Sequence, residues 1–260
     1  MALKGTIQEV DAQRARWAAK RQGQALTLDA GEDFALGGLG RHTEALDARL
    51  VCLPSDPLAD AVPLDQETLA WLKQSRQSPY GGRYPSWGSR ERATSGALVL
   101  YDQYREDAGW THYLALHRHG GIEVGLSHLT YEIRAMTGQL RVFALRSIVG
   151  AAWAAAAMQN EVLDQWHVQM PFELTIGIRN TSRATLGGFA EGWANPGQGL
   201  GEFTICLEDH LLLRHEADDG IDPERYALDL GDRIEQAFGS ISRRHLARVG
   251  EYVGRFDPSF

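Results

Sequence analysis

Four segments between residues 95 and 180 decide the fold: GALVLYDQY (96–104), THYLALHRHGGIEVGLSH (111–128), RVFALRSIVGAAWAAAAMQNEVLDQW (141–166) and FELTIGIRN (172–180). The first two alternate apolar and polar residues with a period of two, which predicts strands, with a tight turn at Gly120-Gly121 inside the second segment. The third has a period of about 3.6 and predicts a long helix, and the fourth predicts another strand. The stretch therefore indicates an α+β fold.

A second long helix is expected near the end of the chain. Asp222-Pro223-Glu224 is a typical helix start, with an N-cap aspartate, a proline where no amide is needed and an acid at the positive end of the dipole. Ala227, Leu230, Ile234 and Phe238 follow at helical spacing, and this predicts one buried face. We expect a mostly antiparallel sheet with the helices 142–166 and 222–239 packed on one face.

The chain divides by composition into three parts. Residues 1–75 predict an N-terminal region of helix and loops, with a helix at 6–22, a strand at 48–54 and a short helix that Asp65 caps. Residues 76–92 are rich in Pro, Gly, Ser and Arg, which is typical of a linker or a docking segment. Residues 93–260 form the predicted α+β domain.

The net charge of −8 argues against a uniformly basic surface for nucleic acid, but the charges are separated along the chain. Residues 201–232 are strongly acidic, whereas 73–92 and 240–255 are basic. Candidate binding residues in the basic segments are Arg83, Trp87, Arg90, Arg92, Arg243 and Arg244. With Tyr80 and Tyr84 nearby, they could hold phosphates and stack bases, or instead belong to a linker or dock an acidic protein.

His117, His119 and Glu123 are the candidates for catalysis. The two histidines are two residues apart on a predicted strand, so both side chains leave the same face, and Glu123 lies on the neighbouring strand. A hydrolase or nuclease site is one interpretation. The other is that histidines beside a Gly-Gly turn are simply exposed to solvent. Because two ligands do not hold a metal, we expect no metal and no cofactor.

Trp153 lies in the alanine run 151–157, and we expect it to be buried between the long helix and the sheet. Cys52 and Cys206 stand alone in apolar contexts, which predicts buried free thiols and a cytoplasmic location. The most apolar run, 148–158, is about half of the roughly 20 residues that span a bilayer, so we expect no membrane contact. The sequence contains no GxSxG, HExxH, CxxC or GxxxxGK[ST] motif.

The succession YLALHRHGGIEVG, VFALRSIVGAAW and MPFELTIGIRNT, at about 110–180, resembles the region that follows the Alba-like module in bacterial Schlafen-type DNA-binding or ATP-binding proteins. The acidic nuclease pattern and the nucleotide-binding features of that family are not matched here. The resemblance therefore implies an accessory module of a bacterial nucleic-acid-associated or phage-defence system, and no nuclease or ATPase activity.

We therefore expect a non-catalytic binding or assembly component with a protein partner or a second copy of itself, and with nucleic acid as a further possible partner. The alternative is a hydrolase or nuclease that uses the histidines and carboxylates of the hairpin at 112–128.

Overall fold

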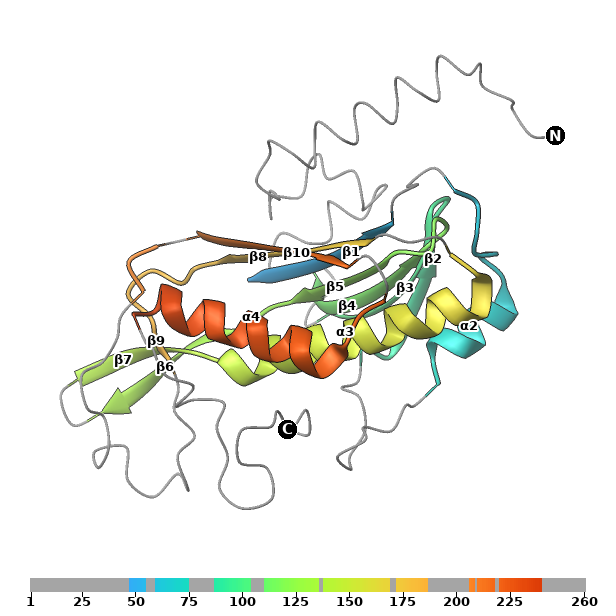
Figure 1. The fold of residues 1–260 in the computed structure, drawn as a ribbon. Coiled ribbons are helices and arrows are strands. Elements are labelled where there is room, and N and C mark those ends of the chain that lie inside the picture. The colour runs from blue at the N-terminus through green and yellow to red at the C-terminus, as the bar shows by residue number, and fades with distance from the viewer. Residues whose placement is uncertain are drawn as a thin grey trace, which may run out of the picture.

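A computed structural model describes residues 47–54, 59–74, 87–103, 110–135, 138–168, 172–186, 206–208, 210–217 and 220–239. Its strands are β1 (Ala48–Pro54), β2 (Arg90–Ala93), β3 (Ala97–Gln103), β4 (Trp110–His117), β5 (Ile122–Leu126), β6 (Thr130–Ala135), β7 (Gly138–Phe143), β8 (Phe172–Arg179), β9 (Thr185–Leu186) and β10 (His210–Ala217). Its helices are α2 (Gln66–Leu72), α3 (Leu145–Trp166) and α4 (Pro223–Ala237), as Figure 1 shows.

The strands form a seven-stranded sheet in the order β10-β8-β1-β5-β4-β3-β2 and a three-stranded sheet in the order β6-β7-β9. All pairs of the larger sheet are antiparallel, and β7 pairs with β9 in parallel. The predicted α+β class with a mostly antiparallel sheet is thus confirmed.

Strand β1 lies in the middle of the larger sheet, although the sequence assigned it to the N-terminal region. Leu50 is opposite Val124 of β5 on one side and Ile176 of β8 on the other. Helix α2 belongs to the same hydrophobic core, through Leu69 and Leu72. The 93–260 segment therefore does not complete this sheet alone: a strand buried on both sides needs two partners, and here they come from distant parts of the chain.

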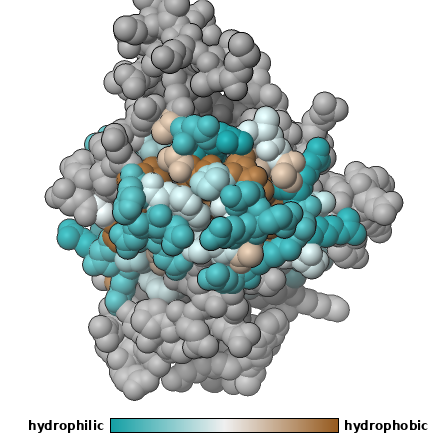
Figure 2. All heavy atoms as spheres, turned by 90° about the vertical axis from the view of Figure 1, so that its right-hand side faces the viewer, coloured by the Kyte–Doolittle hydropathy of each residue, from teal (hydrophilic) through white to brown (hydrophobic). Residues whose placement is uncertain are grey.

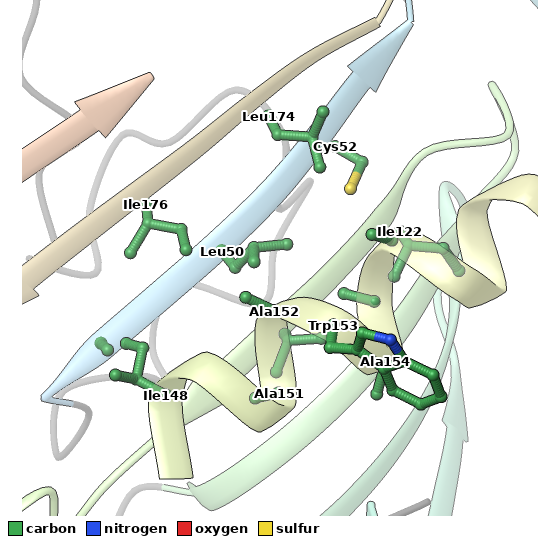
Figure 3. Packing of buried hydrophobic residues seen from close by; sticks show 14 of the residues in the cluster. Leu50, Cys52, Ile122, Ile148, Ala151, Ala152, Trp153, Ala154, Leu174 and Ile176 are labelled. Carbon is green, nitrogen blue, oxygen red and sulfur yellow. The ribbon is translucent and has the colours of Figure 1, made fainter. Parts of the chain in front are cut away.

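Helix α3 lies close to the sheet because its side chains are small. Ala151, Ala152 and Ala154 are buried, and Figure 3 shows them in the same cluster as Leu50 and Ile176. Alanine lets the helix backbone approach the strands, where each larger side chain would have to displace a neighbour. Trp153 is 4% exposed, so it is buried as expected, while its position between the helix and the sheet stays a prediction.

A buried glutamine fastens α3 to the β4–β5 turn. The side chain of Gln159 accepts a hydrogen bond from the Ile122 amide at 3.0 Å and donates one to the Gly120 carbonyl at 2.8 Å. These two backbone groups at the turn therefore have partners although they are shielded from water.

The predicted starts of α2 and α4 are confirmed. The Asp65 carboxylate accepts a hydrogen bond from the Thr68 amide at 2.9 Å, and this bond lowers the pKa of Asp65. Asp222 caps α4 in the same way by accepting from the Arg225 amide at 3.1 Å, with Pro223 following it. Each cap satisfies one of the amides that a helix start leaves unpaired.

Helix α4 packs beside α3, as Figure 1 shows, and buries the face that the sequence predicts. Ala227, Leu230, Ile234 and Phe238 are all in the core. Asn160 of α3 donates to the Ile221 carbonyl at 2.7 Å, which holds the start of α4 against the longer helix.

On the side of the molecule where α2 and the end of α3 lie, the described surface is mainly hydrophilic, with a narrow band of hydrophobic residues (Figure 2). Both cysteines are buried and unpaired, as expected, and burial raises the pKa of the Cys52 thiol. Among the described helices, none has the length and apolar character that a bilayer span requires.

Several expectations concern residues outside the described part of the chain. They are the helix at 6–22, the binding residues Arg83, Arg243 and Arg244, and the aromatic residues Tyr80 and Tyr84.

Candidate functional site

The β4–β5 hairpin positions the histidines. The His117 amide donates to the Gly121 carbonyl at 2.9 Å, and the Gly120 amide donates to the His117 carbonyl at 2.8 Å. Gly120 has φ +86°, and a Cβ there would lie 2.5 Å from a methyl of Val168. These hydrogen bonds confirm the predicted turn at Gly120-Gly121. Position 120 requires glycine, because no other residue suits both its conformation and the space beside Val168.

Several polar and charged side chains of the hairpin lie on one face of the sheet, and the apolar side chains of β4 and β5 lie on the other face. Leu114, Leu116, Ile122 and Val124 are in the core with α3. Successive strand residues point to opposite faces, so Tyr113, His117 and Glu123 share the other face. Arg49 joins them from β1, because Val51, two residues along, is opposite Glu123.

We call Arg49, Tyr113, His117 and Glu123 the buried polar cluster. Oε1 of Glu123 lies 3.1 Å from Nε of Arg49 and accepts a hydrogen bond from the Tyr113 hydroxyl at 2.5 Å. Oε2 of Glu123 lies 2.9 Å from Nε2 of His117. Arg49 and Glu123 have no exposed side-chain surface. Both carboxylate oxygens are therefore engaged inside the protein.

His119 extends the cluster at the turn. Its ring stacks on that of His117 with centroids 5.0 Å apart, and its Nδ1 accepts a hydrogen bond from the Gly121 amide at 3.1 Å. Burial, with the neighbouring His117 as a second cause, lowers the pKa of His119 to about 3. His119 is therefore neutral at physiological pH.

The expectation that the two histidines are exposed is wrong. His117 is 3% exposed and His119 is 8% exposed. The physical reason is Glu123: a buried carboxylate makes it favourable to bury a histidine that binds it, and the second ring packs on the first.

Sequence reasoning brought together His117 and Glu123 but missed Arg49 and Tyr113. One signal was available for Arg49, which is a single charge inside the apolar strand 48–54. A charged residue at such a position needs a buried partner, and Glu123 is an acid at the corresponding place on another predicted strand. Tyr113 carried no comparable signal.

The chemistry that this cluster offers is limited by its closure. Burial, with the nearby Glu123 charge as a second cause, raises the pKa of the Tyr113 phenol well above its usual value, so the phenol stays protonated and donates to the carboxylate. Within the described residues, no group of three or more His, Cys, Asp or Glu side chains could hold a metal ion. Both oxygens of the Glu123 carboxylate are engaged by side chains of the cluster itself.

Two of the remaining described candidates, Arg90 and Arg92, lie on β2 at the end of the sheet. Arg90 and Arg92 are exposed and leave the same side of the strand, with Arg90 opposite Tyr101 of β3. Lys73 of the turn after α2 forms an ion pair with Glu91 between them. The charge of β2 is thus concentrated in two arginines on one side.

Trp87 does not suit a role as an open stacking platform. It is 7% exposed and belongs to the core cluster. The next residue, Gly88, has φ +127°, and a Cβ there would lie 2.2 Å from the Tyr101 carbonyl carbon. Ser89 then donates twice to Asp102 at 2.9 Å, and its backbone amide lowers the pKa of that carboxyl. This tight approach to β3 turns the indole inward.

Comparisons with known proteins give no relative for this chain: no protein-family model, no curated protein and no solved structure matches it.

Proposed function

We propose that this protein is a non-catalytic binding or assembly component that works in the bacterial cytoplasm as a subunit of a nucleic-acid-associated or phage-defence complex. The observation that carries the proposal is a contrast between two charged groups. The buried polar cluster is closed around Glu123, whereas the arginines of β2 are exposed at the end of the sheet. The Schlafen-type resemblance is what points to that kind of complex.

The closure of the buried polar cluster supports a structural role for it. A general acid or base has to come within hydrogen-bond distance of its substrate. Glu123 has no exposed surface, and both of its oxygens already have protein partners. We infer that these residues hold β1, β4 and β5 together.

The arginines of β2 support a role in binding. Guanidinium groups form paired hydrogen bonds with carboxylates and phosphates, and Arg90 and Arg92 leave one side of the strand. The net charge of −8 is unfavourable for contact along an extended phosphate backbone, whereas contact with an acidic patch of a protein can be confined to the arginines of β2. We therefore propose an acidic protein surface as the ligand of this edge.

The packing of the helices is part of the same proposal. We infer that α3 and α4 together cover one face of the seven-stranded sheet, because Ala152 of α3 and Leu230 of α4 share one core with the apolar side chains of β1, β5 and β8. Binding surfaces would then lie at the ends of the sheet.

One observation favours the alternative, a hydrolase or nuclease. His117 and Glu123 form a histidine–carboxylate pair at 2.9 Å, which is the kind of pair that orients a catalytic base. Such an enzyme would have to open the cluster for its substrate. His117→Gln would then abolish hydrolysis of single-stranded or duplex DNA, whereas the proposed binding role predicts no hydrolysis by the wild type.

The deciding experiment reverses the charge of both arginines in the double variant Arg90→Glu/Arg92→Glu. Arg225→Glu is the matched control, since its side chain is 80% exposed on α4. We expect the partner that docks on β2 to co-purify from native cells with the wild type and the control and to be lost from the double variant. Gel shifts with labelled single-stranded and duplex DNA at two salt concentrations should be the same for all three. Sub-micromolar, salt-sensitive DNA binding that disappears in the double variant would show nucleic acid to be the ligand instead.

A further inference from the structure

A groove lies at the opposite end of the sheet from β2, between β10 and α4. Its volume is about 330 Å³. The strand contributes Leu213, Arg214 and His215, and the helix contributes Tyr226, Asp229, Leu230, Asp232 and Arg233. Tyr226 and Leu230 are buried, whereas about half of the Asp229 side chain is exposed. The groove therefore combines an apolar and aromatic base with both carboxylates and guanidinium groups along its sides.

One edge of β10 runs along this groove. The Arg179 amide of β8 donates to the Asp47 carbonyl on the β1 side of the sheet. The backbone N–H and C=O groups of the alternate residues of β8, such as Ile178, therefore point toward β10. Their partners on β10 include Leu211 and Leu213. The backbone groups of Leu212, Arg214 and Glu216 consequently point away from the sheet.

One of these outward groups is occupied by an arginine of the protein itself. Nη1 of Arg233 on α4 donates to the Arg214 carbonyl at 2.8 Å. This contact crosses the groove and covers part of an edge that would otherwise be open to pairing with another strand. It also shows that a guanidinium is accommodated between β10 and α4.

The surroundings of the groove are acidic. The described residues from 206 to 239 carry seven acids against the three arginines Arg214, Arg225 and Arg233, a net charge of −4. A lysine or arginine side chain suits the groove, because its methylene stem can pack on Leu213 and Leu230 while its charge meets Asp229 and Asp232. Asp229 also lies 3.9 Å from Nε of Arg225, an exposed contact within α4 that a ligand cation would replace. The rings of His215 and Tyr226, tilted by 54° with centroids 5.2 Å apart, add an aromatic wall.

We propose that this groove binds an extended basic segment of a partner protein, which adds a strand to the edge of β10 and places a lysine or arginine side chain between β10 and α4. Main-chain hydrogen bonds to the outward groups at 212, 214 and 216 hold the segment. Leu212, 38% exposed, offers an apolar contact to its alternate side chains on the other face. Arg233 competes with the segment for the Arg214 carbonyl. The site is separate from β2, so it stands or falls independently of the function proposed above.

Fluorescence polarisation of the full chain tests this with a labelled eight-residue peptide in which lysine and threonine alternate, and with the same peptide carrying glutamate for lysine. We expect only the basic peptide to bind. Asp229→Asn/Asp232→Asn should weaken binding at least tenfold, whereas Asp164→Asn, an exposed acid on α3, should leave it unchanged. Arg233→Ala should tighten binding about three- to tenfold, because it frees the carbonyl and removes a competing cation.

Strand addition itself is tested by amide hydrogen exchange, in which the peptide should slow exchange at residues 212, 214 and 216. Arg214→Pro removes one outward amide and should abolish peptide binding, with circular dichroism as the check on folding. Equal binding of the acidic peptide, no loss in the double aspartate variant, or weaker binding in Arg233→Ala would overturn the proposal. So would a concentration-dependent dimer in sedimentation that Leu212→Lys abolishes, since a second copy would then occupy the edge.

Discussion

Nε2 of His117 lies 2.9 Å from Oε2 of Glu123, while the other oxygen of that carboxylate lies 3.1 Å from Nε of Arg49. One buried acid thus joins β4, β5 and the central strand β1. Arg49 is 64 residues before Tyr113 and 74 residues before Glu123 in the sequence. The cluster therefore forms only when the sheet forms. Its stability contribution depends on all members being present.

Glu123→Gln should destabilise the protein by roughly 3–5 kcal/mol, because it leaves the charge of Arg49 buried without its ion-pair partner. Urea unfolding followed by circular dichroism measures the change. Glu208→Gln, an exposed acid, is the control and should cost less than about 0.5 kcal/mol. Removing both charges in Arg49→Met/Glu123→Gln should cost less than Glu123→Gln alone. Equal costs for the single variant and its control would show that the pair has no stabilising role.

Stability should fall as the pH is lowered from about 6.5. The pKa of His119 is about 3 in the folded protein, against an ordinary value of 6.5 for histidine. Between pH 6.5 and pH 3 the unfolded chain therefore binds a proton that the folded protein does not bind. The slope for one such group approaches roughly 1.4 kcal/mol per pH unit. Comparing His119→Gln with the wild type between pH 6.5 and pH 5, before most carboxylates titrate, should show a flatter profile in the variant. His128→Asn, at an exposed histidine, should keep the wild-type slope.

Gln159→Leu should cost roughly 2–5 kcal/mol, since it deprives the Ile122 amide and the Gly120 carbonyl of their shared partner. Amide exchange should become faster at residue 122 and in the adjacent turn. Gln165→Leu is a matched change at an exposed position of the same helix and should alter neither stability nor exchange appreciably. Unchanged protection at Ile122 would mean that another group replaces the glutamine.

Trp153→Ala should destabilise the protein by roughly 3–5 kcal/mol because it removes a large buried ring from the core. Ala152→Leu instead enlarges the side chain at the neighbouring position. It should cost roughly 1–3 kcal/mol of stability by overpacking the contact between α3 and β1. Thermal or urea unfolding measures both. A change below about 1 kcal/mol for Trp153→Ala would show that the site collapses without loss.

The local sequence was sufficient for much of the secondary structure. The alternation at 111–117 and 122–126, the glycines of the turn and the caps at Asp65 and Asp222 are each determined within a few residues. Backbone conformation and capping act over short distances, which is why these features could be predicted without knowledge of the fold.

Tertiary structure decided the rest. Strand β1 became a central strand because β5 and β8 arrive on its two sides, and Trp87 turned inward because Gly88 lies against β3. The histidines are buried because Arg49, Tyr113 and Glu123 meet them across three strands. Burial and charge pairing depend on which distant segments come together. Sequence periodicity therefore indicated which face a side chain would take, and only the pairing of strands determined what would lie beside it.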